Sequence, residues 1–508
     1  MDAIAAHAAA KPDTPAVIDG QRGLSWREYH EQRNRLAHAL AGLGLRAGEH
    51  AIVYAHNSIE YMVAGAAARA LGAIAVPMNH RLTAEEAAYV LDDSDAAFVF
   101  VGDAFLGTIE AIRAAAPRVR GWITLGPARR PWAASLADLI AAGDPSGVGI
   151  EPGTNLGGSM IYTAGTTGKP KGARRQTVDQ ATIMPRLKAF DLVRPHVHLA
   201  AGPLYHSAPG AFALYTHVFG GTVVIMPKFD AEEALSLIAR HKVTSTFMAP
   251  ILLKRIADLP AEVRRRYDVT SMQVIVVAAA PCPMKVKEDI LAYFGPVLYE
   301  FYGSTELGMN TLLRPEDVLR KPGSCGRAMP GVELAVLDPD GKPLPPGTPG
   351  ELVIRHYDGV FDEYYKKPEA TAQTRRGDWL SVGDVAWIDD EGFVYICDRI
   401  RDMVISGGVN IYPAEIEDVL HRHPAVQDVA VFGVPDDLWG ERAHAAIQLR
   451  PGMSITPDAL KAFAQGRLAD YKIPREYSFH ETFPRDAAGK LLKRVLREPH
   501  WAQRQSRV

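Results

Sequence analysis

Helical and extended patterns alternate along the first hundred residues, and this alternation constrains the fold more than any other feature. Apolar residues recur at helical spacing from Ser25 to Leu43, and the segment from Glu49 to Tyr54 then has the composition of a buried strand. The same pair recurs as a helical Tyr61–Leu71 with an extended Ala73–Val76, and as a helical Thr83–Asp92 with an extended Ala97–Val101. Such alternation predicts an α/β domain whose parallel strands are covered by helices.

Three later stretches repeat the buried-strand composition beside helical runs: Gly221–Met226, Val243–Met248 and Met272–Val277. After about Pro322 the chain changes to short strands and tight turns. Val332–Leu337 is followed by the turn sequence Asp338-Pro339-Asp340-Gly341, and Gly350–Arg355 comes next. A small antiparallel β subdomain is therefore expected here.

The last part of the chain has a third pattern of predicted helices and strands. A charged junction leads to a predicted helix over Pro413–Arg422, a strand over Val429–Val434 and a helix over Pro457–Leu468. We place a hinge at Ile400-Arg401, which leaves an N-terminal domain over residues 1–399 and a C-terminal domain over residues 402–508 of a size typical for an independent fold. The predicted fold class is α/β: a large N-terminal α/β domain of several subdomains, one of them the small β subdomain, and a smaller C-terminal α+β domain.

Composition excludes several classes of protein. The 508 residues are 47% hydrophobic and 23% charged, as in an ordinary globular protein, and 56 basic residues nearly balance 59 acidic ones. This balance gives no electrostatic basis for binding nucleic acid. Three widely spaced cysteines, Cys282, Cys325 and Cys397, fit neither a disulfide framework nor a zinc site. We interpret them as small core residues in a reducing compartment.

Membrane and metal signals are weak. The first residues lack the positive region and apolar core of a secretory signal. The apolar stretch Tyr61–Met78 is rich in alanine and interrupted by Arg69, which favours a buried helix and strand over a membrane span. A cytoplasmic protein without an integral membrane segment is expected. The histidine pairs His196/His198 and His421/His423 have no third ligand nearby in sequence, so we interpret them as surface residues.

The segment from Tyr162 to Gly172 has the composition of an anion-binding loop. It contains three glycines, three threonines and two lysines directly after an apolar stretch. Backbone N–H groups, hydroxyls and ammonium groups in such a loop suit phosphate, although a solvated surface loop has a similar composition. Pro170 follows Lys169, so the segment is not the phosphate loop of kinases and related ATPases.

Polar residues follow a second apolar strand, Val297–Tyr299. Ligands collect beyond the carboxyl ends of parallel strands, so Tyr302 could stack on a base, Thr305 could bind a phosphate and Glu306 could bind Mg²⁺. An exposed turn is the alternative. Asp384 follows a glycine and could accept hydrogen bonds from ribose hydroxyls, which is a weak signal alone.

Two further stretches complete the set: Asp398–Glu417, which runs from charged residues through Gly407-Gly408 to a helix start at Pro413, and Pro484–Lys490. In this order, the five stretches closely resemble those of the adenylate-forming superfamily of acyl-CoA synthetases, adenylation domains and luciferases. The resemblance spans nearly the whole chain. Ser406–Pro413 resembles the version found in acyl-CoA synthetases, which points to coenzyme A.

The resemblance implies an AMP-forming ligase with ATP and coenzyme A as co-substrates and Mg²⁺ as cofactor. Lys490, Thr305 and Glu306 would be catalytic, with Lys490 between the carboxylate and the α-phosphate, Thr305 at the α-phosphate and Glu306 on Mg²⁺. Lysine there would offset the repulsion between two anions. The other nucleotide contacts would be Thr163, Thr166, Thr167 and Lys171 on the phosphates, Tyr302 on adenine, and Asp384 with Arg399 on the ribose.

The same resemblance implies sites for the other two substrates. Coenzyme A would meet Gly407, Gly408, Trp439, Tyr471 and Lys472, and the acyl pocket would include His206, Ala278, Ala279 and Gly303. For Lys472 a solvated surface role is an equal alternative. In the family the C-terminal domain rotates between the two halves of the reaction. Arg401 stands at the pivot, where aspartate or lysine is usual, and Ala164 and Ala278 stand where serine and glycine are often found.

The acid itself is less constrained. No acidic residue lies between Leu204 and Phe229, so the ammonium of an amino-acid substrate would be buried without a partner. The expected pocket stretches Ala211–Leu214, Phe247–Pro250 and Gly308–Met309 are apolar and small. A fatty or other hydrophobic acid is favoured, and an aryl acid such as a benzoate or cinnamate is nearly as well supported. Transfer to a carrier-protein thiol and a non-catalytic nucleotide-binding role are further alternatives, and a homodimer is compatible with the sequence.

Overall fold

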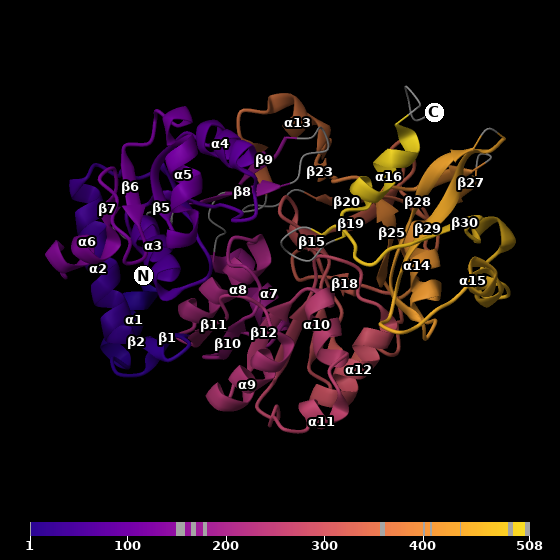
Figure 1. Cartoon of the computed structure of the whole chain (residues 1–508), viewed down its shortest axis with the longest axis horizontal. Helices are drawn as coiled ribbons and strands as arrows, with labels where there is room; N and C mark the ends of the chain where they lie inside the picture. The colour runs from indigo at the N-terminus through magenta and orange to yellow at the C-terminus, as the bar shows by residue number, and fades with distance from the viewer. Residues whose placement is uncertain are drawn as a thin grey trace.

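Two large sheets face each other across a layer of helices (Figure 1). The computed structural model describes residues 2–148, 158–163, 169–175, 180–355, 361–399, 402–406, 409–436, 438–485 and 491–502. Residues from α2 (Trp26–Gly42) and α3 (Ile59–Ala70) pack against strands of both sheets in one core. Helix α2 begins at Ser25, which forms a capping box with Glu28.

The first sheet is seven-stranded in the order β14-β13-β12-β10-β11-β1-β2. Its strands are β1 (Pro15–Asp19), β2 (Arg22–Ser25), β10 (Val197–Ala200), β11 (Thr222–Ile225), β12 (Ser245–Met248), β13 (Val274–Val277) and β14 (Leu298–Glu300). All pairs are parallel except β1 with β2. Helices α9 (Ala231–His241), α10 (Pro250–Ala257) and α12 (Met284–Phe294) cover its outer face, beside the short α11 (Ala261–Arg264).

The second sheet is eight-stranded in the order β21-β9-β8-β4-β3-β5-β6-β7. Its strands are β3 (His50–Tyr54), β4 (Ile74–Pro77), β5 (Ala96–Val101), β6 (Gly121–Thr124), β7 (Ala134–Ser135), β8 (Ser159–Thr163), β9 (Lys171–Arg175) and β21 (Phe361–Tyr364). Helices α4 (Ala84–Asp93) and α5 (Leu106–Ile112) pack on its outer face. The remaining helices of this part are α1 (Ala3–Ala10), α6 (Leu136–Ala142), α7 (Gln180–Ala189) and α8 (Ser207–Val218).

An antiparallel β subdomain follows, as the turn-rich sequence predicts. It consists of β19 (Leu334–Leu337), β20 (Gly350–Arg355), β22 (Arg375–Arg376), β23 (Trp379–Leu380), β24 (Asp384–Ile388) and β25 (Val394–Arg399). Short pairs β15 (Gly303–Ser304) with β16 (Gly308–Met309), and β17 (Thr311–Leu312) with β18 (Arg327–Ala328), connect it to the first sheet, and α13 (Pro368–Gln373) lies between β21 and β22.

The C-terminal domain is α+β and lies at one end of the molecule (Figure 1). Its sheet contains β26 (Val404–Ser406), β27 (Val409–Ile411), β28 (Val426–Asp436), β29 (Gly440–Leu449) and β30 (Glu476–Phe479), and its helices are α14 (Pro413–His421), α15 (Pro457–Ala464) and α16 (Lys493–Trp501). Helix α15 ends before the predicted Leu468 because Gly466 adopts a φ of +73°. The predicted fold class is confirmed. The boundary at 400–401 lies outside the described residues and stays a prediction.

The expectation that His196 and His198 are surface residues was wrong. Both are buried, with exposed fractions of 3% and 2%. They lie at the start of β10, and their ring nitrogens reach the hydroxyls of Thr244 at 2.9 Å and Ser245 at 3.0 Å. Polar partners from the neighbouring strand therefore compensate for their burial. His421 is also largely buried, 3.2 Å from Asp428.

No helix among the described residues is long and apolar enough to cross a membrane. Cys282 and Cys325 are buried, Cys397 is half-buried, and all three are free thiols.

Candidate active site

Two of the predicted nucleotide stretches, 143 residues apart in sequence, meet at Glu306. The Thr163 hydroxyl at the end of β8 donates to Glu306 Oε1 at 3.3 Å, and the Tyr364 hydroxyl donates to the same oxygen at 2.8 Å. Lys171 Nζ lies 5.3 Å from the centre of the Tyr364 ring. Glu306 is only 8% exposed, so its carboxylate is shielded from solvent and accepts hydrogen bonds from two hydroxyl groups. Thr166, Thr167 and Ala164 lie outside the described residues.

A second group gathers around Asp384. The Tyr302 hydroxyl donates to Asp384 Oδ2 at 2.6 Å, and Arg399 Nε lies 3.2 Å from Asp384 Oδ1. Asp384 and Arg399 are directly opposite each other on β24 and β25. Burial, reinforced by the Asp384 charge, raises the pKa of Tyr302 well above its usual value, so the phenol stays protonated. The three residues predicted for adenine and ribose thus form one hydrogen-bonded unit.

A buried ion pair fixes the start of this segment. Lys287 of α12 pairs with Glu300 at the end of β14, and both side chains are almost fully buried. Tyr302 follows two residues later. Its backbone N–H donates to Thr311 Oγ1 at 3.1 Å, which holds the turn that leads to Thr305 and Glu306.

Thr305 approaches the first turn of α8, because its hydroxyl lies 3.5 Å from the Ser207 hydroxyl. His206 immediately precedes this helix. Burial lowers the pKa of His206 to about 4, so its imidazole is neutral at physiological pH. The predicted α-phosphate contact and the predicted acyl-pocket histidine therefore lie at the same end of α8.

The other predicted pocket residues line the turns after β13 and β14. Ala278 is buried directly after β13, and Ala279 has a φ of +77°, in the left-handed region that favours glycine. A side chain held in that conformation costs about 1 kcal/mol or more. Gly303 pairs so closely with β16 that an added Cβ would overlap the Gly308 carbonyl. Glycine at 303 therefore has a structural role beside its predicted pocket role.

The Glu306 group also fits the implied Mg²⁺. This ion is typically held by one or two carboxylates together with substrate phosphates. Glu306 supplies a buried carboxylate with the Thr163 hydroxyl beside it, and Lys171 lies over the ring of Tyr364, which also contacts Glu306. Among the described residues, no group of three or more histidine, cysteine or acidic side chains is clustered as an all-protein metal site would require. The arrangement suits an ion that arrives with a nucleotide.

The residues predicted for coenzyme A lie on the C-terminal domain. Trp439 and Tyr471 are 42% and 53% exposed, and the Arg475 guanidinium lies 5.9 Å from the Trp439 ring. Lys472 Nζ is paired with Glu415 at 2.7 Å, which gives it a structural partner. Gly407, Gly408, Arg401 and the catalytic candidate Lys490 lie outside the described residues, so their roles stay predictions.

A charged cluster lies where the β subdomain meets the C-terminal domain. Lys493 of α16 lies 2.8 Å from Glu417 of α14 and 4.0 Å from Asp398 at the end of β25. Asp398 Oδ2 is buried without a hydrogen-bond partner. Burial raises the pKa of Asp398 to about 6, against the opposing charge of Lys493. Ionisation of its carboxylate therefore lowers the free energy of unfolding.

This cluster predicts a pH-dependent effect of Asp398→Asn. Because the folded pKa lies above the ordinary value of about 3.9, the folded protein retains a proton that the unfolded chain releases between about pH 4 and 6. The contribution of Asp398 to the free energy of unfolding falls as pH rises through that window. Above about pH 6 this destabilisation reaches its full value. Removing the charge should raise the free energy of unfolding by about 2–3 kcal/mol more at pH 7.5 than at pH 4.

Urea unfolding followed by circular dichroism at the two pH values measures this difference. Asp390→Asn, which removes the same charge from an exposed turn, is the matched control and should change little at either pH. An equal effect of Asp398→Asn at pH 7.5 and pH 4 would contradict the raised pKa.

Two residues of the site were not predicted from the sequence. Tyr364 contacts both Glu306 and Lys171, and it comes from β21, which joins the second sheet beside β9. The only sequence signal was a pair of tyrosines before two lysines at 364–367. Ser207 contacts Thr305, and its signal was its place directly after His206. Both contacts depend on pairings between distant segments.

Known proteins resemble this chain over most of its length. A family model described as AMP-binding enzyme matches residues 4–365, and one described as AMP-binding enzyme C-terminal domain matches residues 415–490. The chain is 33% identical over 511 residues to a fatty acid–[acyl-carrier-protein] ligase of Streptomyces coeruleorubidus, covering 99% of this chain and 96% of that protein. It is 35% identical over 490 residues to a long-chain-fatty-acid–CoA ligase of Mycobacterium tuberculosis, covering 94% and 93%.

The fold also matches solved structures. An anthranilate CoA ligase in complex with anthranoyl-AMP superposes with a TM-score of 0.89 at 27% identity, covering 99% of this chain and 97% of that one. The family models, the relatives and the shared fold lead to one conclusion: the chain belongs to the AMP-binding enzymes of the adenylate-forming superfamily and is an AMP-forming acid–thiol ligase.

Proposed function

We propose that this enzyme joins a hydrophobic carboxylic acid to coenzyme A through an acyl-adenylate. A carboxylate oxygen attacks the α-phosphorus of ATP, and pyrophosphate leaves. The thiol sulfur of coenzyme A then attacks the acyl carbonyl and loses its proton, and AMP leaves with the oxygen that joined it to the acyl group. The observation that carries the proposal is the convergence of Thr163, Glu306, Tyr302, Asp384 and Arg399 into two hydrogen-bonded groups at the ends of strands.

In this proposal the two groups bind opposite ends of ATP. Asp384, held by Tyr302 and Arg399, accepts hydrogen bonds from the ribose hydroxyls, and the Tyr302 ring packs on adenine. Thr163 and Lys171 bind the phosphates, and Glu306 holds Mg²⁺. When bound, Mg²⁺ supplies charge neutralisation at the phosphates. Thr305 and Lys490 stabilise the negative charge that develops at the α-phosphate.

For the second half-reaction we propose that the C-terminal domain rotates about Arg401 and brings Gly407 and Gly408 to the site. Trp439, Tyr471 and Lys472 then contact coenzyme A. The free cysteines are not required as nucleophiles, because the acyl group stays on AMP until the thiol attacks. Free thiols also accord with action in the cytoplasm.

The class of acid follows from the apolar character of the predicted pocket. A fatty acid is the first candidate, because the pocket residues are aliphatic or aromatic and no described acidic side chain lies between Leu204 and Phe229. An aryl acid is the second candidate, and the ring-rich cluster around Phe301 favours it. Transfer to a carrier-protein thiol, the activity named for the Streptomyces relative, is a further alternative.

A panel of acids tests the proposal. ATP–pyrophosphate exchange is measured with hexanoate, dodecanoate, hexadecanoate, benzoate and cinnamate, followed by AMP release with and without coenzyme A. The proposal expects exchange with at least one hydrophobic acid and AMP release that requires coenzyme A. If no acid supported exchange, the ligase function would be wrong. If AMP release required a carrier protein and ignored coenzyme A, the carrier-protein alternative would replace it.

A further inference from the structure

Four phenylalanine side chains fill the space behind the predicted acyl site. Phe190, Phe212, Phe247 and Phe301 have exposed fractions between 0% and 7%. The rings of Phe212 and Phe247 are stacked with centroids 5.4 Å apart, and Phe301 lies 6.2 Å from Phe247 and 6.3 Å from Phe212. The same core cluster contains Ala278, the buried pocket residue after β13. Aromatic rings therefore pack beside a residue that is predicted to line the acyl pocket.

Helix α8 provides a scale for the depth of this pocket. Ala208, Phe212 and Thr216 lie on one face, because they are spaced four residues apart. Ala208 packs against the aromatic cluster, Phe212 belongs to it, and Thr216 lies one turn further from the active site. This face therefore presents a small, a large and a small side chain in succession. The large side chain, Phe212, lies between the two small ones along the helix.

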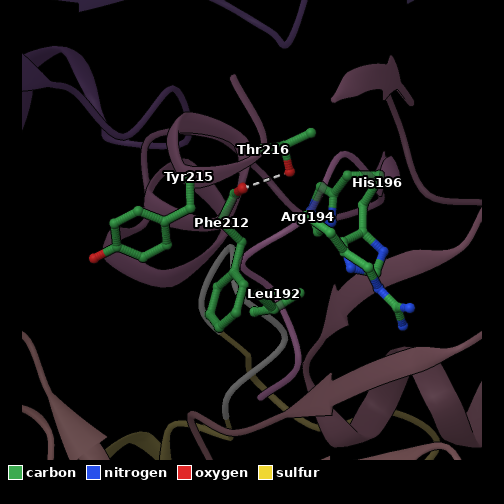
Figure 2. Close-up of a pocket in the computed structure, with 7 residues that line it drawn as sticks. Leu192, Arg194, His196, Phe212, Tyr215 and Thr216 are labelled. Atoms are coloured by element: carbon green, nitrogen blue, oxygen red, sulfur yellow. Dashed lines mark hydrogen bonds between the residues drawn. The ribbon is translucent and has the colours of Figure 1, made fainter. Parts of the chain in front are cut away.

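A small cavity lies beside Phe212 (Figure 2). It holds about 10 Å³ and is lined by Leu192, Arg194, His196, His198, Phe212, Tyr215 and Thr216. In Figure 2 the Phe212 ring lies beside Leu192, whereas Tyr215 points away from the other side chains. Burial lowers the pKa of both histidines, so their imidazoles are neutral. Phe212 thus touches both the aromatic cluster and this cavity.

We propose, on the basis of the function proposed above, that Phe212 is the floor of the acyl pocket and restricts the enzyme to short or single-ring hydrophobic acids. Ser207, beside Thr305, marks the reacting end of the pocket. Five residues separate it from Phe212, which is ~7–8 Å along the helix axis. A fully extended backbone spans ~3.3–3.6 Å over three bonds, so this depth accommodates about six bonds. Acids of about six to eight carbons, or one aromatic ring, fill it.

Truncating Phe212 should lengthen the pocket. Thr216 lies four residues beyond it, a further ~6 Å along the axis, or about five more bonds. Removing the ring connects the acyl site to the cavity beside Leu192. Each additional buried methylene then contributes about fourfold to kcat/KM. Four such methylenes correspond to about 250-fold, which is the expected gain of dodecanoate relative to octanoate.

The experiment compares wild type, Phe212→Ala and Phe212→Leu by ATP–pyrophosphate exchange with even-numbered acids from butanoate to hexadecanoate and with benzoate. Wild type should prefer hexanoate, octanoate or benzoate over dodecanoate by about 100-fold, because the extra methylenes have no space beyond the Phe212 ring. Phe212→Ala should move the optimum toward decanoate and dodecanoate, and Phe212→Leu should move it part of the way. Val218→Ala, a half-buried position at the C-terminal end of the same helix and outside the predicted pocket stretches, is the matched control and should keep the wild-type profile.

Each outcome decides one point. Wild-type exchange with hexadecanoate as fast as with hexanoate would overturn the length limit while leaving the ligase function intact. A normal wild-type preference with no shift in either Phe212 variant would overturn the assignment of Phe212. Absence of exchange with every acid would instead remove the proposed function itself. Circular dichroism tests whether each variant is folded. If Phe212→Ala does not fold, Phe212→Leu alone tests the assignment of Phe212.

Discussion

Replacing Lys490 with alanine is expected to abolish the first half-reaction and spare the second. The ammonium group would no longer offset the repulsion between the substrate carboxylate and the α-phosphate, so acid-dependent ATP–pyrophosphate exchange should fall by about 10³-fold. Conversion of a supplied acyl-adenylate to the thioester should stay within about threefold of wild type. That step needs no added charge at the α-phosphate, because AMP is the leaving group.

The two half-reactions are measured separately, with radiolabelled pyrophosphate for exchange and with synthetic acyl-adenylate plus coenzyme A for thioester formation. Lys461→Ala serves as the matched control because it removes an exposed lysine from α15 of the same domain. It should leave both rates unchanged. If Lys490→Ala reduced both half-reactions equally, the division of labour proposed for the C-terminal domain would be wrong.

The second large effect is expected at Glu306. Glu306→Gln preserves size and one acceptor oxygen for Tyr364 and Thr163, but it removes the carboxylate charge from the proposed phosphate and Mg²⁺ site. Loss of one preorganised electrostatic group of this kind lowers kcat by about 10²–10³-fold. The Mg²⁺ concentration needed for half-maximal exchange should rise as well, because the proposed carboxylate ligand of Mg²⁺ is gone.

Tyr364→Phe separates charge from hydrogen bonding at this position. It removes the 2.8 Å hydrogen bond to Glu306 but leaves the carboxylate charged. A hydrogen bond to a charged group contributes ~1.5–3 kcal/mol, so exchange should fall by about 10–100-fold and the Mg²⁺ dependence should change less than in Glu306→Gln. A Glu306→Gln enzyme with unchanged Mg²⁺ dependence and more than a tenth of wild-type activity would contradict the role of Glu306.

The fold was largely predictable because it depends on local patterns. The alternation from Ser25 to Val101 is realised as α2, β3, α3, β4, α4 and β5 in that order. Buried parallel strands need apolar runs, and the helices between them need one apolar face, so both signals are strong in the sequence. Boundaries depended on single residues: Gly466 ends α15 earlier than its apolar pattern predicts.

Residues of the candidate site were predictable only where they lie near the ends of strands. The rule that ligands collect at the carboxyl ends of strands led to Glu306, and the resemblance implied Thr163; the structure brings the two into hydrogen-bonding distance. Tyr364 could not be found in this way. Its strand β21 comes after every strand of the first sheet in the sequence, and only the folded structure shows that it pairs with β9. The chemical roles of these residues stay predictions until they are measured.

Burial of polar side chains was the main error. His196 and His198 were interpreted as surface residues because no third metal ligand lies nearby in sequence. Their partners Thr244 and Ser245 come from the next strand, and only the pairing of β10 with β12 reveals them. The limit on acyl length depends on the same kind of long-range information, because Phe190, Phe212, Phe247 and Phe301 come from four separate segments.

The bond made at the α-phosphate is the central chemical event, and oxygen-18 follows it directly. An acid labelled in both carboxylate oxygens is incubated with the enzyme, ATP and coenzyme A, and the products are analysed by mass spectrometry. Attack by the carboxylate on the α-phosphorus should place one labelled oxygen in each AMP and none in pyrophosphate, with the other label in the thioester carbonyl. Unlabelled AMP, or label in inorganic phosphate, would contradict an acyl-adenylate.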